Sequence, residues 1–283
     1  MPELFGSDAY SPKEIAARVE NVGVAKARLP LLSTVMLGLL AGAFIGLGAL
    51  YFNIVASDAS LGFAAKRVLG GVCFSLGLLL VVVAGAELFT GNNLLAMAWA
   101  EGKISTTKLL RNWVVVCVAN LAGAAGLAVL VWLSGHLSMN DYAVGKSLVA
   151  TAAAKAGLPL MEAFFRGILC NVLVCMAVWM SFAGRSVVDK FVAIVLPISA
   201  FVAAGFEHSI ANMYIFPLAM LQQMSHPIDI AGAALIDMPH MLANLVVVIA
   251  GNIIGGSVLV ALVYHIVYRR GVSETKPVDT TKS

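Results

Sequence analysis

The chain has 283 residues, of which 60 % are hydrophobic and only 12 % are charged. This composition excludes an ordinary soluble domain and indicates an integral membrane protein, because several apolar runs reach the ~20 residues that cross a ~30 Å bilayer core. The formal net charge of +3 says little, since the basic residues are grouped by loop, and we expect no nucleic-acid partner.

The first predicted element is a short amphipathic helix that precedes the membrane. Residues 11–14 read Ser-Pro-Lys-Glu, which supplies an N-cap, a proline at the first helical position and a glutamate at the third. Ile15, Val19 and Val22 then recur at helical spacing. We expect residues 1–28 to lie in the cytoplasm against the membrane surface. The alternative is a plug or gate over a pore.

Six apolar runs follow, and two of them are too long for one straight span. The second and fifth runs have about 32 residues, and a straight helix of that length measures ~48 Å. Because tilt cannot absorb such an excess, each long run is predicted to contain a break. The six runs cover residues 31–55, 68–99, 113–135, 160–183, 191–224 and 241–268.

A pattern that occurs once in each long run marks the expected breaks. Gly-x-Glu-x4-Asn is found at residues 85–92 and again at 205–212, an offset of 120. Ionisable residues at membrane depth are costly and usually mark a substrate pathway. Paired glycine-interrupted segments in two halves of a chain point to a central site of binding or permeation.

A second pattern indicates that the two halves are an inverted repeat. Asn-x7-Asn-x2-Gly occurs at residues 112–123 and 244–255, an offset of 132. Each half holds three spans, so the second half must insert upside down relative to the first. The predicted fold class is therefore an all-α membrane protein, with six transmembrane helices in a 3+3 inverted repeat and helices two and five broken.

The basic residues predict the orientation in the membrane. Thirteen lysines and arginines lie in the tails and in the loops that share their side, against four in the opposite loops. The positive-inside rule therefore puts both termini in the cytoplasm. Residues 29–270 would form the membrane domain and residues 271–283 a cytoplasmic tail.

The two breaks would meet where Thr90 and His208 lie. A broken membrane helix leaves backbone groups unpaired at mid-depth, which only protein or a wet cavity can satisfy. The start of each following helix attracts anions, and inverted symmetry would aim two such ends at one region. Thr90 and His208 would project into it, and the alternative for His208 is a packed imidazole bonded to a loop carbonyl.

Other polar residues near the breaks have plausible structural roles. Fixed negative charge repels an anion, so we expect Glu87 and Glu207 to hold irregular backbone or to pair with Lys155. Desolvation favours a neutral imidazole at rest. The chain's cysteines and histidines lack metal-ligand spacing, so we expect no metal and no cofactor. Neighbouring residues point apart, so His208 and Ser209 do not suggest a catalytic pair, and we expect no enzyme.

Large apolar side chains near the pattern are candidates for pore constrictions. Phe74 and Leu78 share a helix face at i,i+4. Phe201 precedes His208 by seven residues, which is two helical turns if that stretch is helical. Core packing is the alternative reading for each of them.

Five stretches of the chain resemble the formate/nitrite transporter family, and within it bacterial formate channels. The sequence GFEHSIANM is the most specific of these, and the similarity runs from about residue 29 to residue 270. The five stretches are residues 71–77, 85–90, 181–186, 205–213 and 251–256.

The resemblance implies a homopentamer in the bacterial inner membrane, each protomer having an aquaporin-like six-helix fold and its own pore. It implies passage of formate and related small monovalent anions across the lipid bilayer. By position, His208 would be the central pore histidine, facing Thr90. The resemblance further implies a polar network of Lys155, Glu207, Asn171 and Asn212, and constrictions at Phe74, Leu78, Leu88, Phe89, Val174 and Phe201.

The predicted function is therefore a bidirectional channel for formate and similar anions. His208 would stabilise the anion or hand it a proton, while narrow apolar rings exclude larger solutes and hydrated cations. A proton-coupled symporter for formate or nitrite on the same fold is the alternative. Flux without a pH gradient would favour the channel, and strict coupling would favour the symporter.

Overall fold

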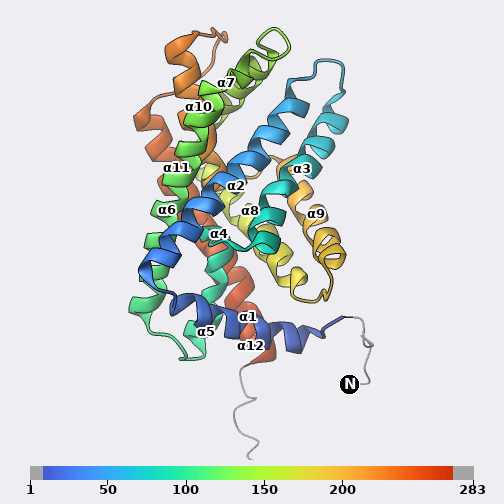
Figure 1. Ribbon diagram of the computed structural model, residues 1–283, viewed down its shortest axis with the longest axis vertical. Coiled ribbons are helices and arrows are strands. Elements are labelled where there is room, and N and C mark those ends of the chain that lie inside the picture. Colours follow the sequence, from blue (N-terminus) through green and yellow to red (C-terminus); the bar gives the residue numbers. More distant parts are fainter. Residues whose placement is uncertain (1–8, 270–283) are drawn as a thin grey trace, which may run out of the picture.

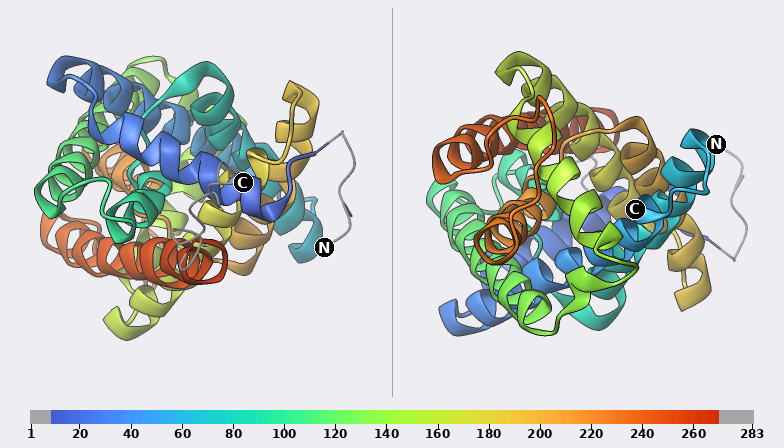
Figure 2. Two further views of the ribbon diagram at one scale, coloured as in Figure 1. Left: turned by 90° about the horizontal axis from the view of Figure 1, so that it is seen from below. Right: turned by 90° about the horizontal axis from the view of Figure 1, so that it is seen from above.

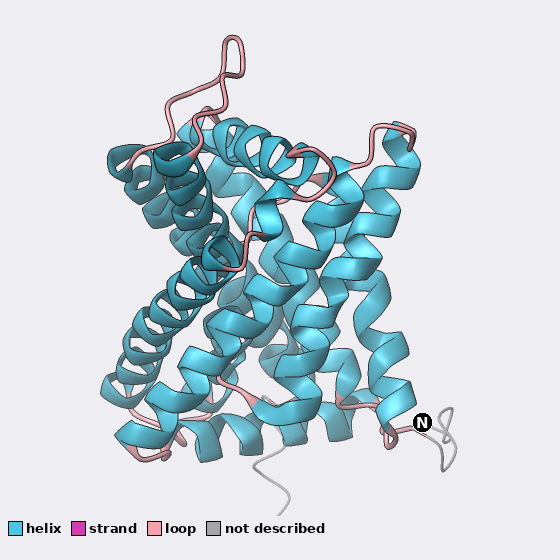
Figure 3. Cartoon of the chain, turned by 45° about the horizontal axis from the view of Figure 1, so that its top comes forward, coloured by secondary structure: helices cyan, strands magenta, loops and turns pink. Residues whose placement is uncertain are grey.

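The computed structural model describes residues 9–269. The predicted tail at 271–283 lies outside this range. Every regular element within it is a helix, as the cartoon in Figure 3 makes plain. The all-helical prediction is confirmed for this part of the chain.

Six helical spans are long and apolar enough to cross a membrane, as predicted. The second, third, fifth and sixth spans begin earlier than the apolar runs, because polar or charged residues lie in their first turns. The second span, for example, begins at Phe63 instead of residue 68, since Lys66 and Arg67 lie within the helix and line a cavity. The spans are Leu31–Ser57 (α2), Phe63–Gly85 (α3 and a π-helical end), Thr106–Leu133 (α6), Leu160–Ser181 (α8), Val187–Ala204 (α9) and Met238–Tyr268 (α11 to α12).

Shorter helical elements complete the described chain. The spans that contain π-helical turns are the second and the sixth. The second span consists of α3 proper (Phe63–Leu79) and a π-helical turn (Leu80–Gly85), and the sixth of α11 proper (Met238–Ile253), a π-helical stretch (Ile254–Leu262) and α12 (Val263–Tyr268). The shorter elements outside the spans are α1 (Pro12–Ala27), α4 (Phe89–Asn92), a 3-10 turn (Asn93–Leu95), α5 (Ala96–Ala100), a 3-10 turn (His136–Ser138), α7 (Ala143–Ala156) and α10 (Ser209–Ser225).

The helix α1 has the start that its sequence predicts. Ser11 and Glu14 form a capping box, and Pro12 is the first helical residue. Ile15 and Val19 are buried, because α1 packs on α5, α12 and the 3-10 turn between α4 and α5. It crosses the lower end of the bundle in Figure 1 and in the left view of Figure 2.

A second short helix, α7, occupies the opposite end of the bundle. It is visible at the top of Figure 1 and crosses the right view of Figure 2. Like α1, it immediately precedes the first span of its half, since α2 begins at Leu31 and α8 at Leu160. The inverted repeat thus extends beyond the three spans of each half to the short helix before them.

The chain leaves helical geometry at the two Gly-x-Glu patterns. Gly85 has φ +88° and Gly205 has φ +75°, a left-handed conformation that glycine adopts without steric cost. Residues 86–88 are non-helical before α4 begins, and α10 begins only at Ser209. Both long runs are therefore divided in the middle of the bundle.

Close contact between α2 and α6 depends on glycine. A Cβ at Gly123 would overlap the carbonyl of Leu39, whereas a Cβ at Gly126 on the same helix would meet nothing within 4 Å. The interface between the two helices therefore has no room for a methyl group at Gly123.

Replacing Gly123 by Ala is expected to destabilise the protein by ~1–3 kcal/mol, the usual cost of overpacking a close contact. Gly126→Ala is the control, and it should be neutral or slightly stabilising because alanine favours helix. The measurement is the unfolding temperature of the purified protein in detergent. Equal effects of the two changes would contradict the close-contact explanation.

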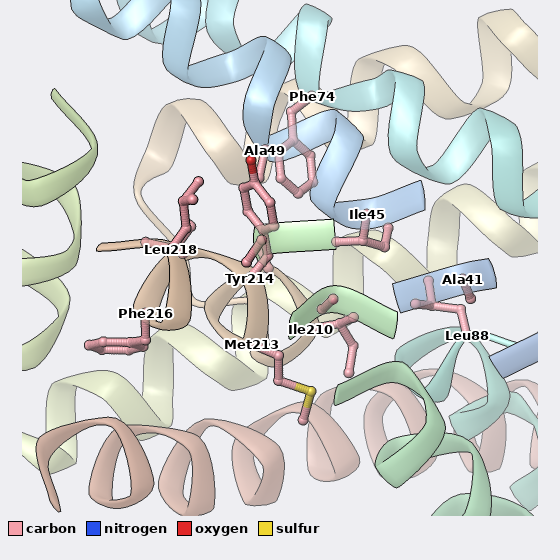
Figure 4. Packing of buried hydrophobic residues seen from close by; sticks show 14 of the residues in the cluster. Ala41, Ile45, Ala49, Phe74, Leu88, Ile210, Met213, Tyr214, Phe216 and Leu218 are labelled. Atoms are coloured by element: carbon pink, nitrogen blue, oxygen red, sulfur yellow. The ribbon is translucent and has the colours of Figure 1, made fainter. Parts of the chain in front are cut away.

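The interior around the breaks is a single apolar cluster with residues from both halves. Figure 4 shows Phe74 from the first half beside Tyr214 from α10, and Ile45 and Ile210 belong to the same cluster. Tyr214 and Ile210 are 1 % and 0 % exposed. This packing fixes the second break against the first.

Candidate functional site

Each break contains a buried glutamate held by the same two kinds of partner. Lys26 Nζ lies 2.9 Å from Glu87 Oε1, and Lys155 Nζ lies 2.8 Å from Glu207 Oε1. The second oxygen of each carboxylate accepts a 2.7 Å hydrogen bond from the asparagine five residues later. The charge of each glutamate is thus paired inside the protein.

A second pair of asparagines holds the non-helical backbone. Asn120 donates to the carbonyl of Glu87 at 2.9 Å and accepts from the Phe89 N–H at 2.9 Å. Asn252 does the same for the carbonyl of Glu207 at 3.1 Å and the Ser209 N–H at 3.0 Å. Backbone groups that the breaks would leave unpaired are therefore satisfied by side-chain amides.

Thr90 and His208 join the two breaks. Thr90 Oγ1 lies 3.0 Å from His208 Nε2, and the two side chains belong to residues that are 0 % and 2 % exposed. The other ring nitrogen, Nδ1, accepts the Ala211 N–H at 3.1 Å, so His208 is also the N-cap of α10. An accepting Nδ1 carries no proton, so the imidazole in this conformation is neutral and has its proton on Nε2, toward Thr90.

Two phenylalanines pack on the imidazole. The Phe201 ring is stacked on His208 with centroids 5.8 Å apart, and Phe74 meets Phe201 edge-on at 5.6 Å. Phe201 reaches His208 across the break after Gly205 and not along a continuous helix. The residues are 5 % (Phe74) and 2 % (Phe201) exposed.

A cavity of about 760 Å³ opens beside the second break. Phe74, Phe201 and His208 are among its lining residues, together with Lys155 and Glu207. It lies at the α7 end of the bundle, since residues of that helix form part of its wall. Basic side chains and aromatic rings therefore line the same cavity.

The remaining residues singled out from the sequence divide into two groups. Asn171 donates to the Thr90 carbonyl at 3.2 Å and to the Asn252 carbonyl at 2.7 Å, so it supports the first break. Asn212 joins Glu207 to Asn244, at 2.7 and 2.8 Å. The other group is buried in the apolar cluster and does not line the cavity: Leu78, Leu88, Phe89 and Val174.

Sequence reasoning missed Lys26 as a partner of the first break. The signal was present, because residues 26–31 read KARLPL and residues 155–160 read KAGLPL, at an offset of 129. Lys26 and Lys155 are therefore equivalent positions in the two halves. Lys26 also donates to Asn92 Oδ1 at 2.8 Å, which ties α1 to the first break.

Comparisons with known proteins agree with this geometry. A family model described as formate/nitrite transporter matches residues 13–266. The protein named formate channel FocA of Escherichia coli strain K12 is 40 % identical over 273 residues, which cover 93 % of this chain and 96 % of that protein. The protein of the same name in Haemophilus influenzae is 36 % identical over 270 residues, which cover 92 % of this chain and 95 % of that protein.

A solved structure described as a pentameric formate channel with formate bound has the same fold. It superposes with a TM-score of 0.79 at 36 % identity and covers 84 % of this chain and 97 % of its own. The sequence, the six spans and the shared fold lead to one conclusion. The chain belongs to the formate/nitrite transporter family.

Proposed function

We propose that the protein is a bidirectional channel for formate and related small monovalent anions, with one pore in each protomer. Relatives at 40 % and 36 % identity are named formate channels. By the same likeness the protein is a homopentamer in the lipid bilayer of a bacterial inner membrane. The distribution of lysine and arginine supports cytoplasmic termini.

The observation that carries the proposal is the contact of 3.0 Å between Thr90 and His208. It joins the two helix breaks beside a cavity that reaches His208. Among residues 9–269, His208 is the histidine that borders this cavity. A small anion that has passed Phe74 and Phe201 would find a hydroxyl and a ring N–H able to replace lost water.

The hydrogen bond from Ala211 to Nδ1 bears on what His208 does. A neutral ring with its proton on Nε2 can donate a hydrogen bond to an anion but has no spare proton to give away. Protonating Nδ1 would set its hydrogen against the Ala211 N–H and break the cap of α10. In this conformation the geometry supports anion stabilisation, and proton transfer would require the ring to release Ala211.

Lysines at both breaks support anion entry from either face. Lys155 borders the cavity and is 15 % exposed at its side chain, while Lys26 at the other break is 26 % exposed. Each offsets a glutamate that would otherwise repel an anion. Phe74 and Phe201, and by family position Leu78 and Leu88, are proposed as the apolar constrictions.

Reconstituted protein should conduct formate when no pH gradient is imposed. The measurement is stopped-flow flux of formate, nitrite, acetate and hydrosulfide into proteoliposomes, each with and without a pH gradient. Channel behaviour predicts flux that persists without a pH gradient and changes direction with the anion gradient. Empty liposomes treated in the same way are the control for permeation of the neutral acids.

A proton-coupled symporter for formate or nitrite is the second candidate. The buried imidazole favours it, since a titratable ring between two helix breaks is a possible proton carrier. Strict dependence of anion uptake on an inward proton gradient would support the symporter and contradict the channel.

A further inference from the structure

We propose that Arg67 and Arg166 form an anion-binding subsite in the cavity beside the second break. It would accept a carboxylate or another small oxyanion before that anion reaches His208. This inference rests on the proposed function, because it adds a binding step on the route to the same histidine.

The guanidinium of Arg67 is held in one orientation. Arg67 lies near the start of α3 and is half-buried, and its Nε donates to the carbonyl of Ala203 in the last turn of α9 at 2.9 Å. Its two terminal nitrogens form no hydrogen bond with any group among residues 9–269. A fixed planar fork with free N–H groups is the geometry that binds a carboxylate through two parallel hydrogen bonds.

Arg67 also lies directly against the second break. A Cβ at Gly205 would come within 2.7 Å of its Nη2 atom. The guanidinium thus occupies the space beside Gly205, whose backbone angle φ of +75° is the feature that favours glycine at this position. Phe201, four residues before Gly205, lines the same cavity, so an anion on Arg67 would be at the entrance to the aromatic pair.

Arg166 flanks the break from α8. Its carbonyl accepts the Glu207 N–H at 3.3 Å, and its side chain lines the cavity. The Nη2 atom of Arg166 bonds Glu162 at 2.9 Å in a pair whose side chains are 40 % and 54 % exposed. Such an exposed pair is weak, so the other nitrogens of Arg166 can turn toward an anion held by Arg67.

The charge of the cavity favours an anion. Glu207 is the acidic residue among those that line it, and it is already paired with Lys155. The basic lining residues outnumber it and leave the cavity with an excess of positive charge. They are Lys66, Arg67, Lys146, Lys155 and Arg166.

The first break has no equivalent of Arg67 in the described chain. A Cβ at Gly85 would meet nothing within 4 Å, whereas at Gly205 it meets the guanidinium. The subsite therefore belongs to one end of an otherwise matched pair of breaks. It gives the α7 end of the bundle a binding step that the α1 end lacks.

The test compares two cations that are neighbours in the same cavity. Arg67→Gln and Lys66→Gln each remove one positive charge, but only the first removes the oriented fork. At ~0.15 M ionic strength, where screening acts over ~8 Å, Arg67→Gln should raise the half-saturating formate concentration by at least about tenfold, the scale of one hydrogen bond to a charged group. Maximal flux should change much less, and Lys66→Gln should change the half-saturating concentration less than about twofold by the same screening.

Two further variants separate orientation from charge and from folding. Arg67→Lys keeps the charge without the fork, so it should resemble Arg67→Gln; full recovery by lysine would overturn the bidentate subsite. Equal effects of Arg67→Gln and Lys66→Gln would also overturn it, in favour of a diffuse field. If Arg67→Gln does not give folded protein, Arg166→Gln is the variant to measure. It should raise the half-saturating formate concentration, and an unchanged value would contradict the proposal.

A binding measurement distinguishes failure of the subsite from failure of the proposed function. Oxalate, a small dicarboxylate, is titrated into the purified protein by calorimetry. Binding that is lost in Arg67→Gln and kept in Lys66→Gln supports the subsite, even if liposome assays detect no formate flux. The opposite result is formate flux with an unchanged half-saturating concentration in Arg67→Gln and no oxalate binding that depends on Arg67. It would retain the proposed function and contradict the subsite.

Discussion

Replacing His208 by Phe is expected to lower formate flux by at least about tenfold, because one hydrogen bond to a charged group is worth ~1.5–3 kcal/mol. The ring N–H that faces Thr90 is lost, and a third aromatic ring would join Phe74 and Phe201 around a site that must replace the anion's water. The cap on the Ala211 N–H is lost as well. Stopped-flow flux in proteoliposomes measures the effect, over a range of pH.

The control for this prediction is His208→Gln. Its amide can donate a hydrogen bond and accept another, so it retains the polarity of the site without a titratable ring. We expect it to keep more flux than His208→Phe and to lack the pH dependence that titration of an imidazole would give. Wild-type flux and pH dependence in His208→Phe would remove the histidine from the mechanism.

Replacing Glu207 by Ala is expected to lower stability by ~3 kcal/mol, the lower end of the range for breaking a buried ion pair. The lower end applies because Lys155 borders the cavity and can turn toward solvent. Asn212 also loses the carboxylate that accepts its amide at 2.7 Å. The unfolding temperature in detergent should fall by ~5–10 °C.

Glu162→Ala is the matched control for the loss of Glu207. Glu162 also pairs with a basic residue, Arg166, but its side chain is 54 % exposed, against 4 % for Glu207. An exposed ion pair contributes only ~0–1 kcal/mol, so the unfolding temperature should hardly move. Similar losses in both variants would show that burial does not set the importance of the Glu207 pair.

The six spans and the two break positions could be predicted because they follow from length and from repeated residues. A run of about 32 apolar residues exceeds the membrane thickness wherever it occurs. The Gly-x-Glu pattern then locates the interruption, since glycine adopts the left-handed backbone found at Gly85 and Gly205. These are local properties that a sequence displays directly.

Partners far apart in the sequence were harder to predict. Lys26 was read as part of a surface helix, because nothing near it in the sequence indicates that Glu87, 61 residues later, is its partner. Arg67 precedes the apolar run at residues 68–99 and so reads as a loop charge in the sequence, whereas it lies in α3 and bonds Ala203 on α9. Comparing the two halves residue by residue, as KARLPL with KAGLPL, would have found the lysine but not the arginine.

Because α1 matches α7, a shortened chain that lacks the amino-terminal region would lose part of the first break. A version beginning at Leu29 would discard Lys26 while leaving Glu87 in place with its side chain only 5 % exposed. By the match of the two halves, that truncation would be equivalent to deleting α7, with Lys155, from the second half of the chain. The first break would then hold a buried negative charge without its lysine, a charge that would oppose the anion passage proposed above.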